Sequence, residues 1–331
     1  MPARTGSEYL QRLRDGREIW VDGARVKDVT EHPQLARAAR SIAALYDLQH
    51  RAELRERMLF PEPSRQELVG LAFLQPRGTA DLERRRLAFK AWADFSGGLL
   101  GRAPDFMSTM LTAMASASDF FARAQRAFGD NLLRFYAHCR DNDLCLTHAL
   151  SKPVSDQSAP LKIVGENDRG LLLSGTRALA TLAPFADEMM VFPGPSPGQH
   201  RQGDAAAYAV ACCVPVATPG LKFLCRESLD FGRPVEDHPL ASRFDEQDAV
   251  VVFEKVLVPW ERVFLKGDGE HANALWRETQ ALPHGIHQFL VKNQAKAEFV
   301  LGVASLVAEG TGVDQHAHVQ GMLGEVVDAI E

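Results

Sequence analysis

The chain lacks the features that mark several protein classes. Its five cysteines form no C-x-x-C pair, and such an unpatterned set indicates reduced thiols in a cytoplasmic protein rather than a disulfide framework. No apolar stretch approaches the roughly 20 residues that span a bilayer. The charged N-terminal stretch also lacks the apolar core of a signal peptide. We therefore expect a cytoplasmic protein that does not enter a membrane.

Basic blocks and nucleotide-binding glycines are missing as well. The net charge is −6 and no polybasic run occurs, so neither nucleic acid nor an anionic membrane surface is an expected partner. No G-x-G-x-x-G motif follows a predicted strand, which argues against a Rossmann nucleotide site. What remains is ordinary for a soluble globular protein: 331 residues with 46% hydrophobic and 24% charged side chains, enough for two or three cores.

The apolar pattern divides the chain into three regions. Residues 1–142 repeat apolar side chains at helical spacing, and we predict a helical domain there. Residues 143–268 contain short apolar or alternating runs between Pro, Gly and Asp clusters, which favours an antiparallel sheet or barrel. Residues 269–331 return to the helical period and stop without a cap. The predicted fold class is α+β.

Two local signals lie near the start of the chain. Ser7 is a candidate N-cap of a first helix that Gly16 ends. The Asp22–Gly23 dipeptide then separates two short apolar runs, which predicts a β-hairpin. The order of helical, β and helical regions is also the layout of the acyl-CoA dehydrogenase-like fold.

Longer strings carry a more specific resemblance. The opening TGSEYLQRLRDGREIWVDGARVKDVTEHP and the later GRAPDFM, DLCLTHAL, GTRALATLAPFADE and HPLASRFDEQDAVVVFEKVLVPWERVF occur in one order along the chain. In these strings the chain resembles the oxygenase components of the 4-hydroxyphenylacetate 3-hydroxylase family. The resemblance implies an acyl-CoA dehydrogenase-like fold with a β-barrel middle domain, and a C-terminal bundle that is truncated here.

The family also implies a reaction. Its members take reduced FAD, with FMN as a second option, from a separate flavin reductase and use O2 to hydroxylate a phenol ortho to its hydroxyl. Family members are homotetramers, so we expect a homo-oligomer. Two alternatives stay open: a catalytically inactive truncated member, and a flavin-dependent acyl-CoA dehydrogenase-like or dehydratase-like enzyme.

Three residues match the family's substrate contacts. His148, in LTHAL, stands where the family contacts the phenolic hydroxyl, and a neutral imidazole can accept that proton. Arg102, in GRAPDF, matches a substrate-binding arginine whose guanidinium can donate two aligned hydrogen bonds. Phe106 stands where members that hydroxylate 4-hydroxyphenylacetate carry tyrosine, so it can line an aromatic pocket but lacks the hydroxyl.

The predicted cofactor contacts come from the same resemblance. Thr181, in RALATLAP, matches a position near N5 of the flavin ring, and Thr147 and Ala180 are assigned to the cofactor with it. Gln157 is the fourth predicted contact, although Asp156-Gln157 replaces a pair that resembles Asp-Arg in the family.

Other polar residues are interpreted as structural. The pairs His284 with His287 and His316 with His318 lack matching carboxylates or cysteines, so we predict exposed helix residues and no metal site. Glu246 and Asp248 are interpreted as part of a charged turn before a hydrophobic strand. Lys292, on a long predicted helix, is assigned only loosely to a flavin or subunit contact.

Overall fold

The computed structural model describes residues 3–150, 159–193 and 205–331 and has a mixed α+β fold. The helices are α1 Gly6–Arg12, α2 Ala36–Leu48, α3 Ala52–Met58, α4 Thr79–Phe95, α5 Pro104–Ser116, α6 Ser118–Ala124, α7 Arg126–Asp141, α8 Ala205–Tyr208, α9 Gly269–Glu278, α10 Ala281–Thr311 and α11 Ala317–Ile330. The strands are β1 Glu18–Val21, β2 Ala24–Val26, β3 Leu59–Pro61, β4 Leu68–Gly70, β5 Leu146–Ala149, β6 Lys162–Asn167, β7 Gly170–Thr181, β8 Glu188–Val191, β9 Val210–Pro215, β10 Leu221–Cys225, β11 Asp248–Pro259 and β12 Val263–Lys266.

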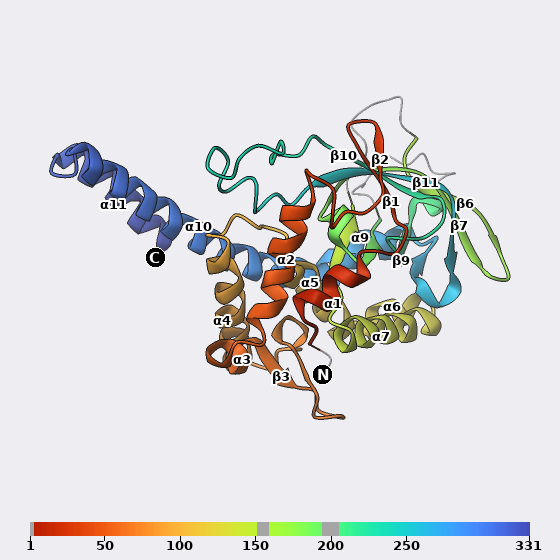
Figure 1. Cartoon of the computed structure of the whole chain (residues 1–331). Helices are drawn as coiled ribbons and strands as arrows, with labels where there is room; N and C mark the ends of the chain where they lie inside the picture. Colours follow the sequence, from red (N-terminus) through yellow and green to blue (C-terminus); the bar gives the residue numbers. More distant parts are fainter. Residues whose placement is uncertain (1–2, 151–158, 194–204) are drawn as a thin grey trace.

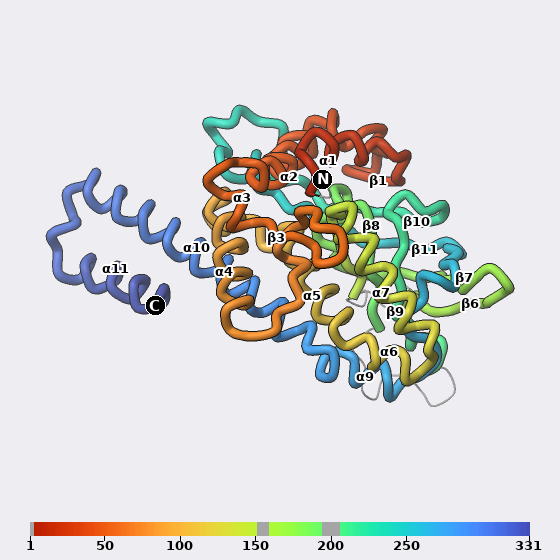
Figure 2. Tube along the Cα trace, turned by 90° about the horizontal axis from the view of Figure 1, so that it is seen from below, coloured from red at the N-terminus to blue at the C-terminus, as the bar shows by residue number. Residues whose placement is uncertain are grey.

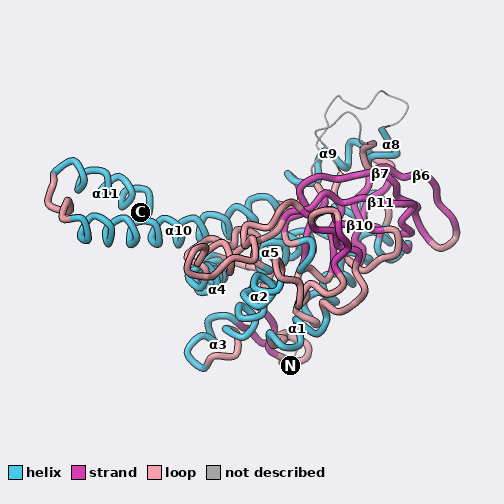
Figure 3. Tube along the Cα trace, turned by 45° about the horizontal axis from the view of Figure 1, so that its top comes forward, coloured by secondary structure: helices cyan, strands magenta, loops and turns pink. Residues whose placement is uncertain are grey.

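The strands form open sheets rather than the expected barrel. A six-stranded sheet has the order β2-β1-β10-β11-β7-β6, and a four-stranded sheet has the order β12-β9-β8-β5. Within the described residues each sheet keeps two free edges, so neither closes on itself. The pairs β1–β10 and β5–β8 are parallel, so the sheets are not purely antiparallel either. Figure 3 shows the strands β6, β7, β10 and β11 at one end of the molecule, the arm of α10 and α11 at the other, and α2–α5 between them.

The long strands β7 and β11 form the centre of the larger sheet. Along β11, Val251 and Phe253 are buried, and after Lys255 the buried positions become Val256 and Val258. Lys255 has a φ of 51°, and the register with β7 shifts at this point. The extra residue is a β-bulge, which turns the apolar side chains of both strand halves to the same face.

The hairpin predicted at Asp22–Gly23 is confirmed as β1 and β2, with Ile19 opposite Val26. This hairpin lies in the first 26 residues of the chain but belongs to the larger sheet, because β1 pairs with β10. The first helix begins earlier than expected. Thr5, rather than Ser7, is the N-cap of α1, and its side chain and that of Glu8 form a capping box.

The longest helix connects the body to a projecting arm. The first half of α10 packs against α4 and α5, and α11 folds back along its second half. Figure 2 shows α10 passing these helices before it leaves the body, and Figure 1 shows the arm with α11 at its end. None of the helices in the described ranges is long and apolar enough to cross a membrane.

Candidate active site

The predicted substrate residues meet where the helices join the two sheets. Arg102 lies two residues before α5, His148 is on β5, and Thr181 is the last residue of β7. The strand β5 contacts both α5 and β7. The three positions are far apart in the chain, and the structure brings their elements together at one junction.

His148 is a neutral acceptor at this junction. It lies half-buried on an edge strand, opposite Met190 of β8. Burial and the positive charge of Arg102 lower the pKa of His148 to about 4, and the Asp248 carboxylate opposes this shift. Its buried Nδ1 has no hydrogen-bond partner within the described ranges. At neutral pH the imidazole is therefore uncharged and can accept a hydrogen bond or a proton.

Arg102 lies between two aromatic side chains. Its guanidinium carbon is 4.2 Å from the ring centroid of Phe106, one turn into α5, and 6.0 Å from that of Phe289 on α10. These contacts hold the planar group by cation–π attraction. The buried Arg102 Nε has no hydrogen-bond partner in the part of the chain that the structure describes. The guanidinium therefore has donor capacity left for a ligand.

Two carboxylates that we interpreted as parts of a charged turn are bonded to this site. Glu246 Oε1 accepts hydrogen bonds from the backbone N–H groups of Gly101 and Arg102, the latter at 3.1 Å. Asp248 Oδ1 accepts a hydrogen bond from the Thr181 hydroxyl, with 2.6 Å between the two oxygen atoms. Sequence reasoning missed these roles, because nothing in the run DEQD identifies partners more than 60 positions away.

The four predicted cofactor residues have different surroundings. Thr181 is 8% exposed. Its hydroxyl donates a hydrogen bond to Asp248, so the lone pairs of the hydroxyl oxygen can still accept a hydrogen bond. Thr147 and Ala180 are fully buried, and the Thr147 hydroxyl donates to the Thr181 carbonyl at 2.5 Å. Thr147 thus supports the backbone that carries Thr181. Gln157 lies outside the described residues.

A second cation lies beside Arg102 and was placed only loosely from the sequence. Lys292 of α10 is 7% exposed, and its Nζ is 4.6 Å from the ring centroid of Phe289. Burial, then Lys296, lowers the pKa of Lys292, while Glu246 acts in the opposite direction. Lys292 and Arg102 give the junction a positive character that suits an anionic ligand.

The histidine pairs have different environments. His284 and His287 are half-buried rather than exposed as we expected, because α4 packs over them: Arg85 Nη1 is 2.9 Å from His284 Nδ1, and Phe89 contacts the His287 ring. His316 and His318 are exposed on the arm, with ring centroids 5.7 Å apart. Within the described residues no group of three or more His, Cys, Asp or Glu side chains could hold a metal ion.

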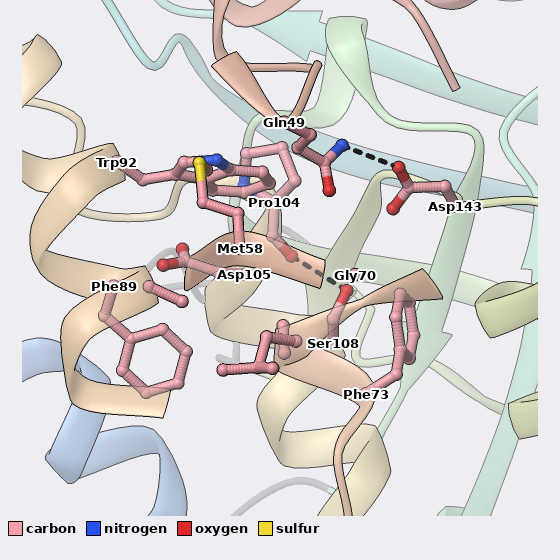
Figure 4. A pocket seen from close by; sticks show the side chains of 13 residues that line it. Gln49, Met58, Gly70, Phe73, Phe89, Trp92, Pro104, Asp105, Ser108 and Asp143 are labelled. Atoms are coloured by element: carbon pink, nitrogen blue, oxygen red, sulfur yellow. Dashed lines mark hydrogen bonds between the residues drawn. The ribbon is translucent and has the colours of Figure 1, made fainter. Parts of the chain in front are cut away.

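A small cavity lies in the helical core between α4 and the start of α5. Figure 4 shows Trp92, Asp105 and Ser108 among its lining residues. Its volume of about 20 Å³ is enough for one water molecule and far too small for a phenol. Burial raises the pKa of Asp105 to about 7, against the opposing effect of Gln288. The cavity is therefore part of the support under α5 and not a substrate pocket.

Comparison with known proteins identifies the class to which this fold and site belong. The family model described as 4-hydroxyphenylacetate 3-hydroxylase N terminal matches residues 5–265, and the model described as its C terminal matches residues 272–331. The chain belongs to the 4-hydroxyphenylacetate 3-hydroxylase family, which confirms the resemblance seen in the sequence.

Particular relatives agree with this assignment. The 4-hydroxyphenylacetate 3-monooxygenase oxygenase component of Geobacillus sp. is 41% identical over 342 aligned residues, which cover 100% of this chain and 68% of the relative. A crystal structure of such an oxygenase component (HpaB), complexed with FAD and 4-hydroxyphenylacetate, is 39% identical with a TM-score of 0.91. It covers 99% of this chain and 69% of its own.

A more distant structure shares the fold alone. The oxygen-tolerant 4-hydroxybutyryl-CoA dehydratase of N. maritimus has a TM-score of 0.82 at 18% identity, covering 98% of this chain and 66% of its own.

Proposed function

We propose that the chain acts as the oxygenase component of a two-component flavin-dependent monooxygenase and hydroxylates a phenol ortho to its hydroxyl. The observation that carries the proposal is the meeting of Arg102 and a neutral His148 beside the aromatic wall of Phe106. Family membership supports it, because the Geobacillus relative is a 4-hydroxyphenylacetate 3-monooxygenase oxygenase component.

The two polar residues have complementary tasks. A free phenol with a pKa of about 10 is a weak nucleophile at neutral pH. Arg102 donates hydrogen bonds to the phenolic oxygen, and its charge favours the phenolate. His148, neutral because its pKa is about 4, accepts the phenolic proton. The developing phenolate charge in turn raises the basicity of His148, so that proton transfer increases electron density at the ortho carbon.

The residues at the junction fit a reduced flavin. The Thr181 hydroxyl oxygen is an available acceptor, and the reduced ring carries an N–H donor at N5. Arg102 Nε and His148 Nδ1 are buried polar atoms without partners within the described ranges, as expected where ligands complete a site. Bound FAD supplies the activation of O2. Thr181 would hold the ring, with Thr147, Ala180 and Gln157 as further predicted contacts, and FMN is the alternative cofactor.

The substrate is a small phenol, and 4-hydroxyphenylacetate is the first to test because it is bound in the related structure. Phe106 offers only its ring, so selectivity for that compound depends on the other walls. A separate flavin reductase supplies the reduced cofactor.

We also propose that the protein is a cytoplasmic homotetramer. Each chain would consist of a helical region (1–142), a β region (143–268) and a second helical region (269–331). Exposed apolar side chains on the arm support self-association: Val303, Leu306, Val307 and Met322.

The experiment combines the chain with a flavin reductase, NADH, FAD and 4-hydroxyphenylacetate, and quantifies the catechol product and hydrogen peroxide. We expect product from the unmodified chain. In His148→Ala we expect roughly a hundredfold less product, because the proton acceptor is lost, with peroxide formation retained. His316→Ala, an exposed histidine on the arm, is the matched control and should match the unmodified chain. Unchanged product yield in His148→Ala would exclude the assigned role, and no product from any phenol would favour an inactive member.

A further inference from the structure

A single short segment, residues 246–248, is bonded to both halves of the candidate site. It leads into the central strand β11, which begins at Asp248, and crosses the junction between the α4–α5 loop and the end of β7. Within the described ranges, this segment supplies side-chain acceptors both to Arg102 and to Thr181. Its side chains and its main chain bond to different parts of the site.

On the side of Arg102, the Glu246 side chain fixes a stretch of backbone. The N–H groups of Gly101 and Arg102 lie just before α5 and have no helical partner, and both donate to Glu246 Oε1. A Cβ atom placed on Gly101 would be 2.9 Å from this oxygen, so the carboxylate lies directly against the main chain. The turn that aims the Arg102 side chain is therefore held by one oxygen atom.

On the side of Thr181, main-chain hydrogen bonds of the segment add to the one that the Asp248 side chain accepts from Thr181. The Leu182 N–H donates to the carbonyl oxygens of Glu246 and Gln247, both at 3.1 Å. Leu182 and Gln247 have φ values of 65° and 51°, a left-handed conformation that is costly for residues other than glycine. Such strain persists only where surrounding bonds fix the backbone, and it concentrates at functional sites.

The Glu246 carboxylate acts here as a hydrogen-bond acceptor rather than as half of an ion pair. Arg102, Lys292 and Asp248 are the charged groups that influence it, and within the described residues none forms a salt bridge with it. Both backbone donors go to the same oxygen, Oε1. A glutamine in this position keeps that oxygen and loses only the charge.

We propose that Glu246 is a positioning residue of the phenol site, which holds the Gly101–Arg102 turn so that the Arg102 guanidinium faces His148. This inference rests on the proposed function, since Arg102 and His148 are there the groups that bind the phenol. Through its main chain, Glu246 also ties this turn to Leu182 and hence to the end of β7. The two halves of the site then share one support.

The test is the affinity of the full chain for 4-hydroxyphenylacetate, measured by calorimetry with reduced FAD present and oxygen absent. Glu246→Ala should weaken binding by about tenfold, the effect of about one lost hydrogen bond. Glu246→Gln should bind within about threefold of the unmodified chain, since its Oε1 still accepts both N–H groups. Glu254→Ala is the matched control: this glutamate is exposed on β11 and, among the residues that the structure describes, pairs only with Lys222, so affinity should not change.

A second readout follows the backbone itself. Amide hydrogen exchange at Gly101 and Arg102 should be faster in Glu246→Ala and normal in Glu246→Gln. If Glu246→Ala does not fold, Glu246→Asp withdraws the acceptor by one methylene and should show the same weaker binding and faster exchange.

Unchanged affinity and exchange in the alanine variant would overturn the proposal, as would a glutamine variant as defective as the alanine variant. A failure of the proposed function would give a different result in these measurements. In that case the unmodified chain does not bind the phenol, while the exchange data still show whether Glu246 holds the turn.

Discussion

Asp105 and Phe106 are neighbours on α5, but their side chains belong to different environments. Phe106 contacts Arg102, whereas Asp105 is buried in the helical core, where its Oδ1 accepts a hydrogen bond from Gln288 at 3.0 Å. Its Oδ2 has no partner within the described ranges. Figure 4 shows the carboxyl group between Phe89 and Trp92. Within the described residues this carboxyl group forms no salt bridge, and its burial outweighs the opposing charge of Arg85, so the protonated form is favoured.

This burial predicts a pH-dependent stability. The pKa of Asp105 is raised from 3.8 to about 7, so between these values the folded chain binds a proton that the unfolded chain has lost. The stabilisation is complete below pH 4 and disappears as the pH rises through 7. From pH 5 to pH 8 the unfolding free energy of the unmodified chain should fall by about 3 kcal/mol relative to that of Asp105→Asn.

Urea unfolding of both chains at pH 5, 6, 7 and 8 measures this difference. Asp119→Asn, an exposed aspartate on α6, is the control and should show no such trend. A pH-independent difference between the unmodified chain and Asp105→Asn would contradict the raised pKa.

At the level of single residues, the sequence predicted the side chains of the candidate site better than the side chains that hold them in position. Motifs of the family brought out His148, Arg102 and Thr181. Glu246 did not stand out, because its partner is 145 positions away and the bond goes to a backbone N–H group, which leaves no trace in residue identity. Side chains that bind the main chain over such distances are visible only once the fold is known.

Among the elements, the loop between α4 and α5 depends on a glycine at its contact with α10. Gly98 has a φ of +68°, and a Cβ atom on it would be 2.5 Å from the Lys292 carbonyl oxygen. Gly16, after α1, has a φ of +82° but nothing within 4 Å of such an atom. Both glycines therefore have a left-handed backbone, but only Gly98 lacks room for a Cβ atom.

We predict that Gly98→Ala is clearly more destabilising than Gly16→Ala. Both substitutions should cost about 1–2 kcal/mol for the left-handed backbone, and Gly98→Ala about 1–3 kcal/mol more for the clash with α10. Denaturant unfolding of the two variants gives the comparison. Equal losses would mean that the loop does not press against α10 in solution.

The sequence also predicted elements unequally well. The hairpin at Asp22–Gly23 was correct, because a turn dipeptide between apolar runs is a local signal. The expectation of a barrel was wrong. Closure depends on which strands become edges, and β2 and β6 are the edges of the larger sheet for reasons of topology that no local pattern contains.

For the molecule as a whole, a buried ionic cluster fastens the N-terminal segment to the β region. The Arg4 guanidinium binds Asp187 at 2.7 Å and the Tyr46 hydroxyl at 2.9 Å, and the Arg4 backbone N–H donates to Asp143. Arg4 and Asp187 are both almost completely buried. Asp187 lies between Thr181 and β8, so the cluster joins the start of the chain to the segment behind the site.

Arg4→Ala should therefore lower the unfolding free energy by about 3 kcal/mol, because the buried Asp187 would lose its closest cation and keep only the more distant, exposed Arg12. Arg14→Ala removes exposed ion pairs with Asp28 and Glu31 and should cost less than about 1 kcal/mol. Thermal and urea unfolding of the two variants provide the measurement. A small effect of Arg4→Ala would show that the cluster contributes little to global stability.

The parallel pairing of β1 with β10 has a consequence for synthesis on the ribosome. Trp20 pairs with Leu224, so the hairpin must wait for about 200 further residues before its partner strand exists. At roughly 5–20 residues per second, this delay lasts roughly 10–40 seconds. During that interval an apolar hairpin edge is exposed to other nascent chains. The order of translation therefore makes the first 26 residues the part of this sheet that waits longest for its partner strand.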